Sequence, residues 1–327
     1  MMRNNLNDET INLMNFFGEK REPFLFIFDY ELQKPLIIPL AEAAEFNILY
    51  SINGLKNFVE QSPGSQEVIF NKHLVSYEIY KKSFDQVLKH IRYGNSFLTN
   101  LTFPTDIETN LNLEEIFYRS NAPFRLLVRN KFVVFSPELF VRISEGKISS
   151  FPMKGTIDAA IPEAETVILS DPKEISEHHT ITDLIRNDLS MVATNVKVER
   201  FRYLDEVSTN DKKLLQISSE ISGMLPENWN ENIGSIFAKL LPAGSICGAP
   251  KMKTLEIIRE SEISPRGYYT GVFGIFDGYN VESAVMIRFI ENTNGKMVYR
   301  SGGGITVFSD PEKEYQELID KVYLPIY

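Results

Sequence analysis

The sequence has little cysteine, little histidine and a deficit of positive charge. Its 327 residues include one cysteine, Cys247, and four histidines. A single cysteine excludes an internal disulfide and a zinc site built from several thiolates, and it favours the cytoplasm as the location. With 34 basic and 44 acidic residues the formal net charge is −10, which argues against nucleic acid and anionic membranes as the main partners.

Long apolar runs are missing as well. The sequence holds no stretch of about 18 consecutive apolar residues, so we expect no membrane-spanning helix. Hydrophobic residues make up 43% and charged residues 24%, as is ordinary for a globular protein. The length is compatible with one large α/β or α+β domain.

Apolar periodicity and turn residues predict a chain that mixes strands and helices. Strands are expected at residues 23–30, 34–40, 96–103, 124–128, 132–135, 139–143, 268–276, 281–291 and 297–300, and the turn at 145–147 leads into a further strand. Helices are expected at 82–93, 113–120, 171–188, 235–241 and 249–260, and a last helix is expected to open at Asp310. Short turns between successive strands favour an antiparallel sheet.

Lys154 stands in the segment FPMKGT, where few other residues carry a charge. Pro152 fixes φ on one side, and Gly155 lets the backbone turn or approach a ligand closely on the other. A lysine in this setting is either a snorkelling surface residue or a positioned amine. To act as a nucleophile it must be desolvated or placed near other cations.

Two of the predicted helices open with the same Asp-Pro pair. The first presents Glu174 and Glu177 on one face, and the second presents Glu314, Glu317 and Lys321 on one face. Four carboxylates on two helices are able to hold a hard cation such as Mg²⁺, which takes oxygen ligands. The alternative is that both faces are solvated, with Glu317 and Lys321 as an ordinary surface pair.

A run of three glycines, Gly302, Gly303 and Gly304, precedes the last helix. Its backbone N–H groups can cradle an anion, but a tight turn explains the run equally well. The segment 242–251 (PAGSICGAPK) joins two predicted helices. Segments of this kind are usually structural, although Lys251 could face an anion.

Several segments, taken in order, resemble one family. They are SPELF at 136–140, PMKGT at 152–156, the stretch 171–189 with KEISEH and DLIRNDL, PAGSICGAPK at 242–251, RGYYTG at 266–271, AVMIR at 284–288 and the stretch 302–321. Together they resemble the chorismate-utilising enzymes, which include anthranilate synthase component I, aminodeoxychorismate synthase component I and the isochorismate and salicylate synthases. The resemblance covers about residues 80–325. It favours the interpretation of Lys154 as a positioned amine over that of a surface residue.

The resemblance implies one α+β domain over residues 1–327, with two packed, mainly antiparallel sheets and helices outside. Within it, residues 1–75 would form an N-terminal subregion and residues 80–325 the core that carries the motifs. The resemblance also implies chorismate as substrate and Mg²⁺ as cofactor. By motif position, Glu177 and Glu317 would bind the metal beside the acids Glu174 and Glu314, and the substrate would be held by Tyr269, Arg288, Lys321, Thr156 and the backbone around Gly302, Gly303 and Gly304.

The residue at position 154 separates activities within this family. A lysine at this position resembles aminodeoxychorismate synthase component I, an enzyme of the para-aminobenzoate branch of folate synthesis. Family members with the other activities usually have alanine there. The implied reaction adds the Lys154 amine to C2 of chorismate while Glu138 protonates the departing C4 hydroxyl, and ammonia then displaces the lysine by attack at C4. Because no glutaminase motif is visible, ammonia is expected from a separate glutamine amidotransferase subunit.

Two positions depart from the family pattern. Leu98 stands where isochorismate-type enzymes carry a water-activating base, which weakens that alternative. Gln216 stands where a histidine is usual, which alters the contacts offered to the substrate. Two further alternatives stay open: anthranilate synthase component I, and a non-catalytic chorismate-binding subunit.

Overall fold

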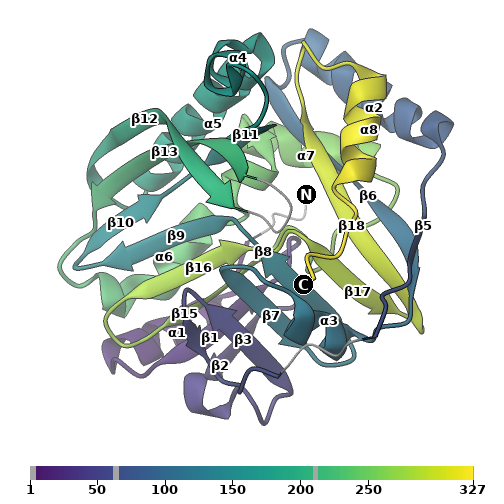
Figure 1. Ribbon diagram of the computed structural model, residues 1–327. Helices are drawn as coiled ribbons and strands as arrows, with labels where there is room; N and C mark the ends of the chain where they lie inside the picture. The colour runs from purple at the N-terminus through teal and green to yellow at the C-terminus, as the bar shows by residue number, and fades with distance from the viewer. Residues whose placement is uncertain (1–4, 62–65, 209–212, 327) are drawn as a thin grey trace.

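Two antiparallel sheets form the centre of the molecule in the computed structural model, which describes residues 5–61, 66–208 and 213–326 (Figure 1). The first sheet runs β11 (Met153–Asp158), β13 (Lys213–Met224), β10 (Lys147–Ser150), β9 (Leu139–Ser144), β16 (Val281–Val285), β15 (Val272–Phe276), β1 (Phe24–Phe28) and β2 (Leu36–Pro39), with β12 (Thr194–Ser208) paired to β13. The second runs β14 (Gly248–Ala249), β6 (Leu98–Thr109), β18 (Lys296–Ile305), β17 (Phe289–Thr293), β8 (Phe132–Ser136), β7 (Phe124–Val128), β3 (Ile48–Ile52) and β4 (Leu55–Lys56), with β5 (Phe70–His73) paired to β6. The pairings between these strands are antiparallel, as the short turns predicted.

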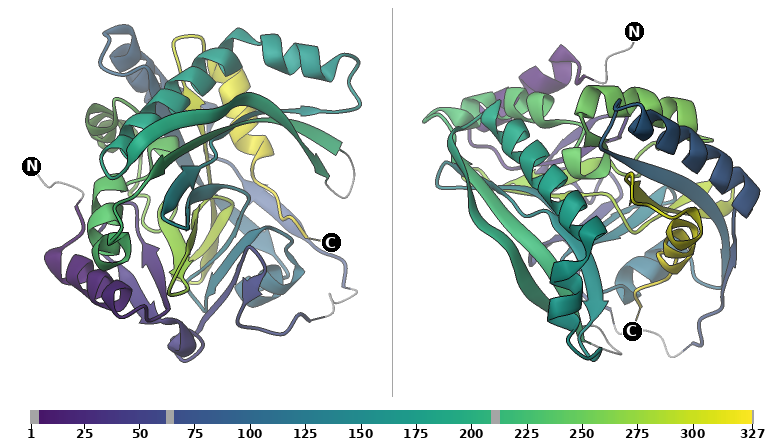
Figure 2. Two further views of the ribbon diagram at one scale, coloured as in Figure 1. Left: turned by 90° about the vertical axis from the view of Figure 1, so that its left-hand side faces the viewer. Right: turned by 90° about the horizontal axis from the view of Figure 1, so that it is seen from above.

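Helices cover the outer faces of the sheets (Figure 2). The first sheet is covered by α1 (Asp8–Glu19), α4 (Ala164–Ser170), α5 (Pro172–Ser190) and α6 (Ile233–Leu240), and the second by α2 (Tyr77–Arg92), α3 (Leu113–Arg119), α7 (Lys251–Ser261) and α8 (Pro311–Asp320). Short 3-10 turns lie at Leu40–Glu42, Trp229–Asn232 and Gly244–Ile246. The α+β fold implied by the resemblance, a single domain of two packed sheets with helices outside, is therefore confirmed. The division into a subregion at 1–75 and a core at 80–325 stays a prediction.

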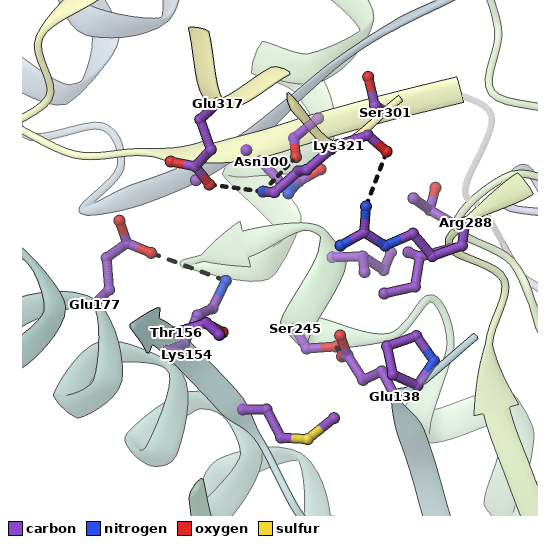
Figure 3. Close-up of a pocket in the computed structure, with 18 of the residues that line it drawn as sticks. Asn100, Glu138, Lys154, Thr156, Glu177, Ser245, Arg288, Ser301, Glu317 and Lys321 are labelled. Carbon is purple, nitrogen blue, oxygen red and sulfur yellow. Dashed lines mark hydrogen bonds and ion pairs between the residues drawn. The ribbon is translucent and has the colours of Figure 1, made fainter. Parts of the chain in front are cut away.

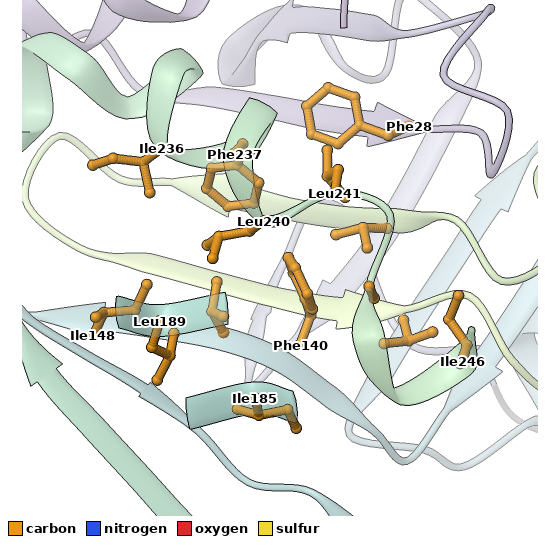
Figure 4. Close-up of a cluster of buried hydrophobic side chains, with 14 of the residues drawn as sticks. Phe28, Phe140, Ile148, Ile185, Leu189, Ile236, Phe237, Leu240, Leu241 and Ile246 are labelled. Carbon is orange, nitrogen blue, oxygen red and sulfur yellow. The ribbon is translucent and has the colours of Figure 1, made fainter. Parts of the chain in front are cut away.

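The largest apolar cluster lies between the first sheet and its helices (Figure 4). The Phe237 ring of α6 contacts Phe28 of β1 and Phe140 of β9, with ring centroids 6.1 and 6.2 Å apart. A second cluster lies between the two sheets and takes Leu25 and Ile27 from the other face of β1. Both faces of β1 are thus buried, which explains its uninterrupted apolar sequence FLFIF.

The two helices that carry the predicted carboxylates begin where the sequence placed them. Asp171 accepts a hydrogen bond from the Glu174 N–H at 3.0 Å, and Asp310 accepts from the N–H groups of Glu312 and Lys313. Each aspartate therefore caps its helix, and a proline follows in the first turn. Within the described ranges, no helix has both the length and the apolar character needed to cross a bilayer.

Two of the predicted elements are wrong in ways that affect the site. The single strand expected at 281–291 is two strands in different sheets, because Arg288 adopts a left-handed conformation with φ 52° between β16 and β17. The glycine run is not a turn or loop before the last helix. Gly302, Gly303 and Gly304 lie inside β18, where they pair with Thr102, Leu101 and Asn100 of β6. The neighbouring strand holds the glycines extended, which their own sequence does not reveal.

Candidate active site

A cavity of about 510 Å³ is lined by residues from both sheets and from α5 and α8 (Figure 3). Most residues that the sequence singled out meet here. Those that line the cavity are Glu138, Lys154, Thr156, Glu174, Glu177, Tyr269, Arg288, Gly302, Gly303, Gly304, Glu317 and Lys321. Glu314 is buried one turn before Glu317, beside Gly303. The fold thus gathers residues separated by more than half the chain around one space.

Glu138 and Arg288 lie where the chain passes from one sheet to the other. Glu138 follows β8 of the second sheet and precedes β9 of the first, and Arg288 lies between β16 and β17. The Val285 N–H donates to the Glu138 carbonyl and the Phe135 N–H donates to the Arg288 carbonyl, each at 3.1 Å. The two crossovers therefore run side by side, and both side chains face the cavity (Figure 3).

Lys154 reaches the cavity from an irregular point in β11. The pairing with β13 shifts between Lys154 and Thr156, and Gly155 between them has φ 74°. A bulge of this kind redirects a side chain out of the regular alternation of a strand. The Lys154 side chain is 20% exposed, and its Nζ lies 3.9 Å from Oε2 of Glu177. Its amine therefore lies in the cavity among other charges.

Glu138 is half-buried in the cavity wall and accepts a hydrogen bond from the Ser245 hydroxyl at 2.6 Å. Burial raises the pKa of the Glu138 carboxyl, while the Ser245 hydrogen bond and the charges of Lys154 and Lys321 oppose that rise. The raised pKa favours the protonated form, which is the form that can donate a proton to a leaving group.

The carboxylates of α5 and α8 approach two glycines of β18. A Cβ on Gly304 would lie 3.0 Å from Oε2 of Glu177, and one on Gly303 would lie 3.6 Å from Oε2 of Glu314 and 3.8 Å from Oε1 of Glu317. The absence of side chains at Gly303 and Gly304 leaves room for the carboxylate oxygens. An all-oxygen donor set of this kind suits Mg²⁺.

Lysines contact two of these carboxylates. Lys321 Nζ lies 2.7 Å from Oε1 of Glu317, and Lys154 Nζ lies 3.9 Å from Oε2 of Glu177. Over residues 5–61, 66–208 and 213–326, no three acidic, histidine or cysteine side chains are grouped closely enough to enclose an ion. The residues fit Mg²⁺ by the chemistry of their donors, and binding it would require the lysine contacts to rearrange.

Cationic and phenolic groups line the side of the cavity near β17 and β18. Arg288 Nη1 donates to the Lys321 carbonyl at 2.8 Å, and Lys321 Nζ donates to the Gly302 carbonyl at 2.9 Å. Tyr269 is 4% exposed, and burial raises the pKa of its phenol, so it stays a hydrogen-bond donor at neutral pH. Such a group of donors is suited to bind an organic anion.

Residues 25–326 match the family model described as chorismate binding enzyme. The chain belongs to the family of chorismate-binding enzymes. It is 52% identical over 317 residues to an uncharacterised PabA-like protein of Pasteurella multocida, covering 97% of this chain and 98% of that one. It is 34% identical to anthranilate synthase component 1 of Leptospira biflexa, covering 76% of this chain and 56% of that one. The menaquinone-specific isochorismate synthase MenF of Escherichia coli has the same fold, with a TM-score of 0.72, 14% identity, and coverage of 96% and 79%.

The chain is therefore a chorismate-utilising enzyme, and its cavity includes residues that the motifs did not assign. Ser245 lines it from the segment PAGSICGAPK, in which the resemblance assigns the serine no role. Tyr299 and Ser301 line the cavity from β18. Tyr299 and Ser301 lie four and two positions before Gly303, and this spacing is a signal in the sequence, because residues at i, i+2 and i+4 share one face of a strand.

Other residues of the recognised segments have structural contacts. Lys251 pairs with Asp188 at 2.6 Å and donates to the Leu240 carbonyl, so it ties α7 to α5 and α6. His178 is buried and shares a 2.7 Å hydrogen bond with Ser219. Burial, with the nearby charges of Arg202 and Lys154, lowers the pKa of His178 to about 4.

The two departures from the family pattern also lie near the cavity. Gln216 of β13 lines it opposite Thr156. Leu98 is 2% exposed, and its Cδ1 would lie 3.0 Å from a Cβ on Gly304. An apolar side chain, which cannot act as a base, thus lies beside Gly304.

Proposed function

We propose that this chain is an aminodeoxychorismate synthase component I, which converts chorismate and ammonia to 4-amino-4-deoxychorismate. The observation that carries the proposal is the position of Lys154, whose amine enters the cavity from the bulge in β11 while Glu138 enters it from the first crossover. Membership of the family supports chorismate as the substrate. A lysine opposite a carboxylic acid then supports an amination that passes through the lysine.

In the first step the lone pair of Lys154 Nζ attacks C2 of chorismate, and both ring double bonds shift, from C1=C2 to C1=C6 and from C5=C6 to C4=C5. The C4–oxygen bond breaks, and Glu138 gives its proton to the departing oxygen, which leaves as water. The lysine nitrogen becomes a secondary ammonium bonded to C2, and Glu138 becomes a carboxylate. Glu138 must therefore start protonated, which its burial favours.

In the second step ammonia attacks C4, both ring double bonds move back, and the bond between C2 and Lys154 breaks. The lysine leaves as a neutral amine, and the new ammonium at C4 returns one proton to Glu138. The sum is chorismate plus ammonia to 4-amino-4-deoxychorismate plus water, with the enzyme restored. A covalent intermediate thus replaces one difficult displacement with two easier ones.

We assign Mg²⁺ to Glu177 and Glu317, with Glu174 and Glu314 as neighbouring acids. Bound there, Mg²⁺ would neutralise part of the charge between these acids and the dianionic substrate. The chain's own groups for the substrate carboxylates are Tyr269, Arg288, Lys321, Thr156 and the backbone of Gly302, Gly303 and Gly304. They orient the ring so that C2 faces the lysine and C4 faces the acid.

The proposed partner is a glutamine amidotransferase subunit that supplies ammonia. The only cysteine, Cys247, is fully buried, and burial raises the pKa of its thiol to about 11, so it is a poor nucleophile for a glutaminase. The product would enter para-aminobenzoate and folate synthesis in the cytoplasm. The purified chain should use ammonium and ignore glutamine.

Anthranilate synthase component I is the alternative function, and the similarity to the Leptospira biflexa protein favours it. The two activities differ in the ring carbon that receives nitrogen. Identifying the product of chorismate and ammonium by NMR and mass spectrometry therefore separates them. Any turnover at all excludes a non-catalytic chorismate-binding subunit.

The deciding experiment targets Lys154. Lys154→Ala should still bind chorismate with Mg²⁺ but make little 4-amino-4-deoxychorismate, and Lys154→Arg should fail as well because a guanidinium stays protonated. Wild-type enzyme mixed with chorismate in the absence of ammonia should show a mass adduct on the peptide that contains Lys154. If the alanine variant makes the para product at the wild-type rate, Lys154 is not the nucleophile and the proposal is wrong.

A further inference from the structure

The guanidinium of Arg288 is held by the residues that follow α8. Its Nη1 donates to the Lys321 carbonyl at 2.8 Å, and its central carbon lies 4.7 Å from the centre of the Tyr323 ring. An arginine carries five N–H donors, so these contacts fix one edge and one face and leave other donors for a ligand. Arg288 thus enters the cavity with its side chain already oriented.

The segment that makes these contacts is anchored at both ends. At its start Lys72 Nζ donates to the carbonyls of Ile319 and Val322. At its end Ile326 forms a β-bridge with Ser120, next to a hydrogen bond from Asn121 to Pro325. Its apolar residues Val322, Leu324 and Ile326 belong to the cluster around α3, which fixes the backbone in between.

Tyr323 differs from these neighbours because 43% of it is exposed. Its ring does not fill the core of that cluster and instead packs against the guanidinium of Arg288. A cation over an aromatic face is attracted by the negative face of the ring, and the attraction strengthens where water is excluded. The ring is therefore placed to orient the guanidinium more than to stabilise the fold.

We propose that residues 321–326 form a C-terminal strap that positions Arg288 for the carboxylate of the substrate, with the Tyr323 ring as the positioning residue. This inference rests on the role of Arg288 in the proposed function. A cation that is oriented before the ligand arrives loses less conformational freedom on binding, so the strap raises affinity. The same strap begins at Lys321, whose amine contacts Glu317, and it thereby links the anion-binding side of the cavity to the acidic face of α8.

The test uses the purified full chain with chorismate, ammonium and Mg²⁺. Tyr323→Ala should raise KM for chorismate about fivefold to tenfold, the size expected for one partly shielded cation–π contact, and change kcat by less than about twofold. Tyr323→Phe keeps the aromatic face and should behave like the wild type. Tyr323→Leu keeps apolar bulk without that face and should behave like the alanine variant, which separates orientation of Arg288 from packing.

Tyr279 is a matched control on the same chain. It is 68% exposed, and Arg21 lies over its ring at 5.1 Å, remote from the cavity-lining residues. Tyr279→Ala removes an equivalent cation–π pair and should leave KM unchanged. If Tyr323→Ala and Tyr279→Ala have the same KM, or if Tyr323→Phe is as impaired as Tyr323→Ala, the strap does not act through the ring and the inference is wrong.

Arg288→Lys distinguishes failure of the strap from failure of the proposed function. Lysine keeps the charge but loses the planar fork that binds a carboxylate. A large rise in KM for Arg288→Lys together with a normal KM for Tyr323→Ala overturns the strap alone. A normal KM for Arg288→Lys overturns the assignment of Arg288 to the substrate carboxylate, and the strap with it.

Discussion

The Ser245 hydroxyl donates a 2.6 Å hydrogen bond to Oε1 of Glu138, the carboxyl proposed to protonate the leaving hydroxyl. This bond stabilises the charged form of Glu138 and opposes burial, which raises its pKa. Ser245 therefore limits how far the pKa of Glu138 rises, and with it the pH up to which the acid keeps its proton.

Ser245→Ala should raise the pKa of Glu138 further, because the donor to the carboxylate is lost. Activity that needs protonated Glu138 is lost as pH rises through that pKa, so the alkaline limb of the kcat/KM profile should move to higher pH. The measurement is a pH–rate profile for both proteins with Mg²⁺ and ammonia held constant. A limb that stays in place, or moves to lower pH, would contradict the role given to Ser245.

Gly155→Ala should cost both stability and activity. The position has φ 74°, which is unfavourable for alanine by about 1 kcal/mol, and a Cβ there would lie 2.8 Å from Oε2 of Glu174. Gly94 is the control, since its φ is 77° and a Cβ there would meet nothing within 4 Å. Both alanine variants should unfold at lower urea concentrations than the wild type, but only Gly155→Ala should lose turnover. Equal activity of the two variants would show that the bulge does not position Lys154.

Removal of the proposed metal ligands should abolish turnover and metal binding together. Glu177→Gln and Glu317→Gln keep the size of the side chain but lose the charge that attracts Mg²⁺. Mg²⁺ should raise the melting temperature of the wild type and not that of these variants, which gives a readout independent of activity. Glu312→Gln, at an exposed site on the same helix, should respond to Mg²⁺ as the wild type does. Full activity in excess chelator would refute the metal assignment.

The ion pair between Arg266 and Glu262 should matter far more to stability than a surface pair. Their side chains are 1% and 4% exposed and 2.7 Å apart, so Glu262→Gln leaves a buried guanidinium without its counter-charge. We expect a loss of about 3–5 kcal/mol in the free energy of unfolding. Breaking the half-exposed pair of Arg129 and Glu114 by Glu114→Gln should cost below about 1 kcal/mol. Urea unfolding followed by circular dichroism measures both, and similar losses would argue against the difference in burial as the cause.

Local sequence patterns predicted well those features that depend on residues close together in the sequence. The caps at Asp171 and Asp310 depend on a short polar side chain followed by a helical run, and both were found where expected. Helix α1 was missed, although its N-cap Asn7 is an ordinary signal. Strands β12 and β13 were missed because their polar and charged residues hide the alternation that marks a half-buried strand.

Sequence patterns failed where the structure depends on pairing between segments that are far apart in the sequence. Residues 281–291 are apolar enough for one strand, and only the divergence of the two sheets makes the chain break at Arg288. Ordered motifs indicated Lys154 and Glu138, whereas Tyr299 lies in no motif, and its spacing from Gly303 becomes informative only once residues 299–303 are known to form a strand that passes the cavity. The fold class was therefore accessible from the sequence, and the full cavity wall was not.

The two crossovers also place the candidate site where the chain connects one sheet to the other. Glu138 and Arg288 sit where the chain leaves one sheet for the other, and backbone hydrogen bonds from Val285 and Phe135 hold these places together. A local opening of either sheet at these two hydrogen bonds would separate the acid from the cation. Catalytic activity therefore depends on both sheets being folded together. A ligand that contacts both crossovers would slow hydrogen exchange in both sheets at once.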